Sequence, residues 1–406
     1  MRVSTANLYE ASISNLQRRQ TALQTQQQQL TSGKRVLSAS DDPTGAARAE
    51  RALATVGRVD ANQRSLEASR NSMTLAESAL GDAGELLQQA RETMASAGNA
   101  SYTDAERASL AQKLKGLRDQ LLAIANRTDG AGGYVFGGQG SAQPPFLDRS
   151  GGVTYVGVPG QIQSGNLEDF PLTLDGRGAW ESAPSGNGFF VTAAGTNPTS
   201  TPPGAAAQGW IDSGSVSDPS KLTGLAYSIA ISGTAPSQTY TITPAPVDGT
   251  PDTGTFTSGK ALEFDGMSMT ISGAPVNGDN FSLTPSTDSL KVFDVMDRAI
   301  NELLTPNRGG AQITQANNNA LRDIDAVMTR LQSGRSQAGE VLNKLDGSES
   351  RMSALKLYSQ QEQSAATDLD MTQAISEFSN QQTGYQAALQ TYAMVQRMSL
   401  FQYING

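Results

Sequence analysis

The feature that most constrains this chain is a seven-residue spacing of large apolar side chains within its first hundred residues. The residues in question are Val59, Leu66, Met73, Leu80, Leu87 and Met94. Small residues stand three positions after each of them, namely Asn62, Ser69, Ala76, Ala83, Ala90 and Ala97. This alternation is typical of a long helix that a partner helix approaches closely over about nine turns. It predicts the seam of a helical bundle.

A polar corner precedes this helix. The stretch LTSGKRVLSASDDPTGAARAE, residues 30–50, ends one amphipathic helix and begins the next. Asp42 is a good N-cap, and Pro43 suits the first helical position because its missing N–H is not needed there. Asp41, Asp42 and Pro43 are therefore expected to form a joint between two helical segments.

The helix before the corner has a weaker apolar face. Ile13, Leu16, Leu23 and Leu30 share one side of it, but Gln20, Gln27 and Lys34 occupy the intervening positions. Such a narrow and polar stripe does not hold an isolated helix together in water. We expect this segment to be loose in the monomer and to become ordered against neighbouring chains.

The C-terminal part of the chain mirrors this plan. One apolar seam comprises Leu321, Ile324, Met328, Leu331, Ala338, Leu342, Leu345 and Met352. A second, at the end of the chain, comprises Met371, Ile375, Phe378, Tyr385, Leu389 and Tyr392, and we extend it to Met398, Leu400 and Phe401. The two outermost segments are expected to pair and to form the subunit interface.

The middle of the chain has a different composition. Residues 139–287 are rich in Gly, Pro, Thr and Ser and contain twelve acidic and four basic residues, whereas the remainder is almost neutral. Stretches such as QTYTITPAP, ALEFDGMSMTISG and DNFSLTP alternate β-formers with turn residues. This block is predicted to be all-β.

Together these patterns predict an α+β fold, in which both chain ends form a long antiparallel helical coiled-coil bundle with an inserted all-β domain. The predicted parts are terminal coiled-coil segments at 1–40 and 365–406, a bundle domain at 41–138 and 288–364, and an outer β domain at 139–287.

The composition excludes several classes of function. A formal net charge of −9 argues against nucleic acid as the main partner. The absence of histidine and cysteine rules out Ser-His-Asp and Cys-His catalysis and the usual zinc sites. We expect no cofactor and no metal. No apolar run is long enough to span a membrane, and the first thirty residues lack the apolar core of a signal peptide.

Carboxylate chemistry in the β block is the remaining enzymatic alternative. Its acid/base candidates are the pairs Glu168/Asp169, Glu263/Asp265 and Asp248/Asp252. Acidic residues in turn-rich segments are more often solvated or form turns. Trp180 and Trp210 offer a sugar-binding platform, although lone tryptophans are more often core residues.

Three long stretches resemble the flagellin superfamily. They are the corner quoted above, the helix AESALGDAGELLQQARETMASAGN and the C-terminal TDLDMTQAISEFSNQQTGYQAALQTYAMVQRMSLFQYING. Within the superfamily, the start MRVSTANLYEASISNLQRRQ, the link GGYVFGGQGSAQPPF and the ending RMSLFQYI resemble hook–filament junction proteins more than flagellins. The resemblance implies a structural, non-enzymatic component of the bacterial flagellum.

The same resemblance implies the partners and the location. These are hook-associated protein 1 and flagellin, copies of the chain in a ring, an export chaperone and the flagellar type III export apparatus, with no nucleic acid and no membrane. Export would proceed without a cleavable signal, and the product would be extracellular. The alternatives are a flagellin that builds the filament itself, or a surface-displayed β domain that binds carbohydrate or acts as a carboxylate-based glycosidase.

Overall fold

The computed structural model describes residues 5–99, 101–140, 143–165, 167–201 and 203–404. The chain forms two compact units, one made of Met1–Arg64 with Gly347–Gly406 and the other of Ser65–Asp346. Helical segments from both chain ends pack together, and an antiparallel β region is inserted between them in sequence. The predicted fold class is therefore confirmed.

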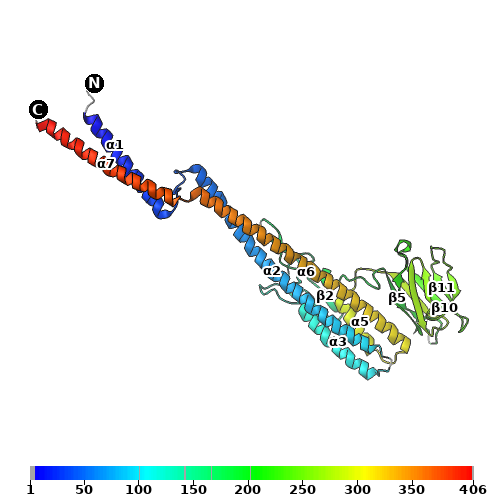
Figure 1. The fold of residues 1–406 in the computed structure, drawn as a ribbon. Coiled ribbons are helices and arrows are strands. Elements are labelled where there is room, and N and C mark those ends of the chain that lie inside the picture. The colour runs from blue at the N-terminus through cyan, green and yellow to red at the C-terminus, as the bar shows by residue number, and fades with distance from the viewer. Residues whose placement is uncertain (1–4, 100, 141–142, 166, 202, 405–406) are drawn as a thin grey trace. The chain divides into compact units, whose positions relative to one another are not determined.

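The first unit consists of two helical pairs. Helix α1 (Thr5–Ser32) lies beside α7 (Met371–Ile404), and the two run antiparallel (Figure 1). The beginning of α2 (Pro43–Ala97) and the end of α6 (Gly310–Thr367) complete this unit. In that second pair, Lys356 of α6 forms an ion pair with Asp60 of α2 at 2.7 Å.

The second unit has a helical core of α2, α3 (Asp104–Ala125), α5 (Val292–Leu304) and α6. Ion pairs between α2 and α6 occur in antiparallel order along the two helices: Arg91–Asp325, Glu77–Arg335 and Arg70–Asp346. The heptad residues of α2, from Val59 to Met94, are all buried, with exposures between 0% and 2%. The small residues that alternate with them are buried as well, which allows the close approach of the neighbouring helices.

The start of α3 shows how local sequence fixes a helix end. Thr103 accepts a hydrogen bond from the backbone N–H of Glu106, and the Glu106 carboxylate accepts one from the backbone N–H of Thr103. This reciprocal arrangement satisfies two N–H groups that the first turn of a helix leaves without partners.

The described residues between 126 and 183 lie against the helical core of the second unit. They form β1 (Phe146–Arg149), β2 (Gly152–Tyr155), β3 (Gln163–Ser164), β4 (Phe170–Pro171) and α4 (Gly176–Trp180). Phe136, Phe146 and Trp180 are buried together with Phe293 of α5. The rings of Trp180 and Phe293 stack, with their centroids 5.8 Å apart. The predicted β domain, residues 139–287, therefore includes strands β1 to β4 and helix α4, and Phe146 and Trp180 within this part pack into the helical core.

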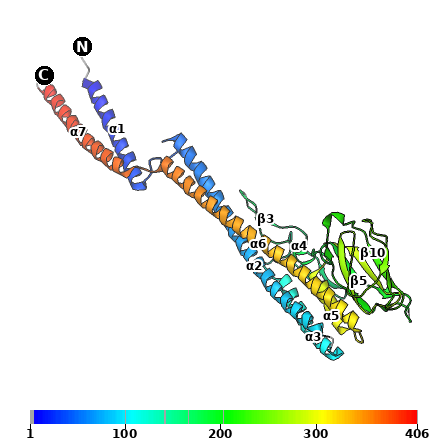
Figure 2. The ribbon, with the colours of Figure 1, turned by 45° about the vertical axis from the view of Figure 1, so that its right-hand side comes forward.

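A separate apolar core begins at Phe190. Its strands are β5 (Phe190–Ala194), β6 (Thr196–Asn197), β7 (Ala205–Ala206), β8 (Gly209–Ile211), β9 (Ser215–Val216), β10 (Tyr227–Ser232), β11 (Thr239–Thr243), β12 (Thr253–Thr255), β13 (Ala261–Phe264), β14 (Met267–Gly273) and β15 (Asn280–Pro285). Five strands pair in the order β12-β11-β10-β15-β5, and four others form β13-β14-β8 with β9 on β14. Figure 2 shows these strands, in green, beside the beginning of α6.

Alternating burial defines the inner faces of the two sheets. Tyr227, Ile229 and Ile231 of β10 point into the same core as Met269 and Ile271 of β14, whereas the residues between them are more exposed. This period of two is the pattern expected of sheets with one buried face. Among the residues that the structure describes, no helix is both long and apolar enough to cross a membrane.

Candidate functional site

The predicted subunit interface maps to the pair α1 and α7. The two helices meet along their length: the Gln26 amide donates a hydrogen bond to the Glu377 carboxylate at 3.1 Å. Further along, Gly384 of α7 lies against Arg19 of α1, where a Cβ atom would come within 2.6 Å of the guanidinium. Because the Arg19 side chain is exposed and can move, this contact marks where α1 and α7 lie side by side and does not by itself require a glycine.

The predicted interface residues are only partly covered by this pairing. Ile13, Leu16, Leu23 and Leu30 of α1 are half-buried, as are Phe378, Tyr385 and Tyr392 of α7. Ile375 and Leu389 are 56% and 42% exposed, respectively. The side chains of Met398, Leu400 and Phe401 lie outside the described residues.

Three of the uncovered apolar side chains of α7 share one face of the helix, whereas Met394, which is 64% exposed, lies about 140° from Met371. At about 100° per residue, Met371 and Ile375 are only about 40° apart, and Leu389 returns to the direction of Met371 after about five turns. Met371 is 45% exposed. We call Met371, Ile375 and Leu389 the open stripe. Apolar side chains that gather on one face of a helix without a partner mark a packing surface.

Polar residues inside the α1–α7 pair weaken it as an isolated unit. Gln26 is 6% exposed, and its amide also lies 3.5 Å from the carbonyl oxygen of Ala374. The buried Oε1 atom of Gln381 has no hydrogen-bond partner within the described part of the chain. Sequence periodicity did not single out these two glutamines. The polar positions predicted in the α1 seam from the sequence are Gln20, Gln27 and Lys34 instead.

The predicted corner residues lie between α1 and α2. Pro43 is the first residue of α2, and Asp42 caps the helix by accepting hydrogen bonds from the Gly45 N–H at 2.9 Å and the Thr44 hydroxyl at 2.8 Å. Three hydrogen bonds lower the pKa of Asp42 to about 2. The largest effect comes from the Gly45 N–H, and smaller ones come from the Thr44 hydroxyl and from Arg35. Asp41 accepts from the backbone N–H groups of Leu37 and Ser38, and the Ser38 contact lowers its pKa.

The carboxylates considered for catalysis are used differently by the fold. Asp265 is fully buried and accepts hydrogen bonds from the Tyr227 hydroxyl and from the N–H groups of Val247 and Asp248. Asp248 accepts in turn from the Asp265 N–H, and contacts with Thr250 lower its pKa, the opposite of what a general acid needs. Glu263 is exposed on β13. Glu263 and Asp265 therefore do not form an acid/base pair, because Glu263 lies on the surface and Asp265 holds the fold together.

The other candidates also lack the features of a site. Glu168 is half-buried and has partners, and its neighbour Asp169 is exposed, as is Asp252. Trp180 is 1% exposed within the helical core, so the sugar-platform interpretation is wrong for this residue, and Trp210 is half-buried. In the described ranges, no group of three or more His, Cys, Asp or Glu residues could hold a metal ion.

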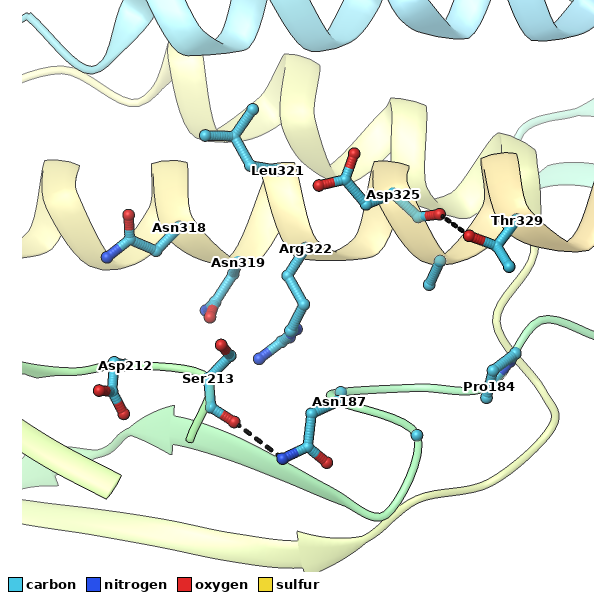
Figure 3. Close-up of a pocket in the computed structure, with 13 residues that line it drawn as sticks. Pro184, Asn187, Asp212, Ser213, Asn318, Asn319, Leu321, Arg322, Asp325 and Thr329 are labelled. Carbon is cyan, nitrogen blue, oxygen red and sulfur yellow. Dashed lines mark hydrogen bonds between the residues drawn. The ribbon is translucent and has the colours of Figure 1, made fainter. Parts of the chain in front are cut away.

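A cleft of about 570 Å³ separates α6 from the loops before β5 and after β8. Figure 3 shows Asn319 and Arg322 of α6 pointing toward Asp212, Ser213 and Asn187. Arg322 is engaged by Asp323 at 3.0 Å, and Asn187 donates to the carbonyl oxygen of Ser213 at 3.2 Å. The contacts that join the β region to α6 are the hydrogen bond from the Ile211 N–H to the Gln315 side-chain oxygen at 2.8 Å and the one from Arg322 to the Thr192 carbonyl at 3.4 Å.

Comparison with known proteins agrees with the helical plan. Residues 3–141 match the bacterial flagellin N-terminal helical region, and residues 321–404 match the bacterial flagellin C-terminal helical region. Residues 206–285 match the D2-like domain of flagellar hook-associated protein 1.

Individual relatives extend the match to the whole chain. Flagellar hook-associated protein 3 of Escherichia coli (strain K12) is 25% identical over 418 residues, which cover 99% of both chains. The Salmonella typhimurium protein of the same name is 36% identical over 160 residues, covering 37% of this chain but only 48% of that protein. The solved flagellar junction protein FlgL from Legionella pneumophila is 26% identical, with a TM-score of 0.66, covering 79% of this chain and 100% of that one.

Proposed function

Because the chain belongs to the flagellin family, we propose that it is a structural, non-enzymatic subunit of the junction between hook and filament in the bacterial flagellum. In this role it links hook-associated protein 1 on the hook side to flagellin on the filament side. Copies of the chain form a ring, and the flagellar type III apparatus and its chaperone export the chain to the extracellular flagellum.

The observation that carries this proposal is the open stripe on α7. Pairing with α1 leaves Met371, Ile375 and Leu389 exposed on one face, which is unfavourable for a lone chain in water. Neighbouring helices of the same kind would cover this face in a tubular wall. The end-to-end match to a hook-associated protein 3 favours the junction over the filament as the place of assembly.

Deletion of the gene tests the junction role. We expect cells that keep intact hooks and release flagellin into the medium, because the filament has nothing to grow from. Immunogold labelling of sheared wild-type flagella should give one band at the base of the filament. Label along the whole filament, or a mutant with no flagellin anywhere, would instead identify the chain as a flagellin.

Leu389→Asp tests the open stripe itself. The side chain is 42% exposed in the monomer, so the melting of the purified chain should change little. Incorporation into flagella should fall by more than about tenfold, because an unpaired carboxylate would be buried between subunits. Leu225→Asp is the matched control, since Leu225 is a 47% exposed leucine in the β region. Normal incorporation of the Leu389 variant would remove the stripe from the interface.

The incomplete pairing of α1 and α7 also supports a second element of this proposal. Within the segments 1–40 and 365–406, the helices α1 and α7 become ordered only when neighbouring chains cover them, whereas residues 41–364 hold the bundle and the β region. The buried, unpartnered Gln381 carbonyl and the exposed stripe are features that assembly would complete.

A further inference from the structure

Two connecting segments in the first unit are hydrogen-bonded to each other. One comprises residues 33–42, between α1 and α2, and the other comprises residues 368–370, between α6 and α7. The Arg35 N–H donates to the Thr367 carbonyl at 2.7 Å, and the Leu369 N–H donates to the Gly33 carbonyl at 3.0 Å. Segments more than 330 positions apart in sequence thus form one short ladder. We call residues 33–45 with 366–370 the joint.

The Arg35 side chain adds a second connection across the joint. Its Nη2 atom donates to the Ala366 carbonyl at 2.9 Å and to the Asp42 carboxylate at 3.1 Å. Ala366 lies in the last turn of α6, where carbonyl groups lack helical partners and a cation is favourable. Asp42 caps the first turn of α2. One guanidinium therefore connects the end of one helix to the beginning of another.

Gly45 shows how closely these two helix ends approach each other. A Cβ atom on this buried glycine would lie 2.5 Å from the Asp42 carboxylate oxygen and 3.3 Å from the Ala366 carbonyl oxygen. Neither the capping carboxylate nor the backbone carbonyl can move away without breaking its contacts. Gly57, on the same helix, has nothing within 4 Å of the equivalent position. Gly45 therefore marks a close approach of these two helix ends, which Gly57 does not share.

From this geometry we infer that Arg35 is a positioning residue that fastens both connecting segments into one joint, so that α1 and α7 leave α2 and α6 together. Two separate connecting segments would each rotate independently about a few backbone bonds. Hydrogen bonds between the segments remove that independence, because a change in one segment breaks the hydrogen bonds of the other. The joint thereby sets the direction in which the terminal helices leave α2 and α6.

The role in assembly rests on the proposed function, but the joint itself can be tested in the isolated full-length chain. Hydrogen exchange of the position-35 and Leu369 amides reports whether the ladder is closed. In Arg35→Gln we expect exchange of both amides to accelerate by about tenfold, with bundle amides such as that of Leu87 unchanged. In Arg35→Lys the exchange rates should lie between those of the wild type and Arg35→Gln. The lysine ammonium group retains the charge but lacks the planar guanidinium that reaches two acceptors.

Two matched controls sharpen the experiment. Lys34→Gln removes a neighbouring cation and should leave both amides protected. Gly45→Ala should open the joint as Arg35→Gln does, whereas Gly57→Ala should not. Unchanged exchange of Leu369 in Arg35→Gln, equal acceleration in Lys34→Gln, or fast exchange of both amides in the wild-type chain would each overturn the inference.

The two proposals fail in different ways. In cells, Arg35→Gln should reduce incorporation into flagella while the bundle melts as in the wild type. If immunogold labelling does not place the wild-type chain at the junction, the proposed function fails and the exchange result still stands. If exchange at Leu369 is unaffected by Arg35→Gln while incorporation is lost, the joint is disproved and the junction role is untouched.

Discussion

Leu87→Asp is expected to abolish cooperative unfolding of the helical core. Leu87 has no exposed surface and lies among apolar residues of α2, α3 and α6. An aspartate there would bury a carboxylate with no cation to neutralise it, which costs at least about 4–5 kcal/mol. That is close to the lower limit of the whole stability of an ordinary domain, about 5–15 kcal/mol.

Far-ultraviolet circular dichroism during heating measures this effect. The variant should lose its sharp transition or melt at a much lower temperature, and Leu87→Ala should lose about 2–5 kcal/mol by leaving a cavity. Leu53→Asp is the control because Leu53 lies on the same helix but is 50% exposed. A normal melting curve for Leu87→Asp would show that this part of the seam does not hold the bundle together.

Arg118→Met is expected to give the second largest loss of stability. The Arg118 side chain is only 9% exposed, and its guanidinium holds Asp148 of β1 at 2.7 Å and Asp297 of α5 at 2.5 Å. Three elements of the second unit thus meet at one cation on α3. Without it, two carboxylates face each other in a partly buried place, and we expect a loss of about 3 kcal/mol. This loss is at the lower end of the range for a broken buried ion pair, because both carboxylates are partly exposed to water.

The pH dependence gives this prediction a second readout. Hydrogen bonds from Arg118 lower the pKa of Asp148. A carboxyl whose pKa is lower in the folded state adds stability above its unfolded pKa of about 3.9, and this stability is lost as the pH falls through the folded value. The deficit of Arg118→Met, measured by chemical denaturation, should therefore shrink in acid. Arg91→Met, which breaks the exposed pair with Asp325, should change stability little. An equal loss in the two variants would contradict the special role of Arg118.

Local chemistry made much of this fold readable in advance. The seven-residue spacing from Val59 to Met94, the cap at Asp42 and Pro43, and the capping box at Thr103 all depend on residues within about one to two turns of each other. Helical periodicity and capping are short-range effects. They can therefore be predicted from nearby residues, whatever the conformation of the rest of the chain.

The open stripe was only half predictable. The apolar face of α7 follows from its spacing, but which part of it α1 covers depends on how the two helices meet. Phe378 and Tyr385 are half-buried, whereas Ile375 and Leu389 are exposed, although all four share the predicted seam. The spacing shows that these side chains lie on one side of a helix. It does not show how much of that side the partner helix covers.

By itself, the sequence determined the helical ends, the β-type middle and the corner between α1 and α2. Only the tertiary structure decided that the aromatic residues Phe146 and Trp180 join the helical core rather than the β core. It alone brought Arg35 to Ala366, 331 positions away, and Arg118 to Asp297, 179 positions away. Such contacts depend on which surfaces of the folded elements meet, and burial and charge pairing between distant segments leave no periodic trace along the chain.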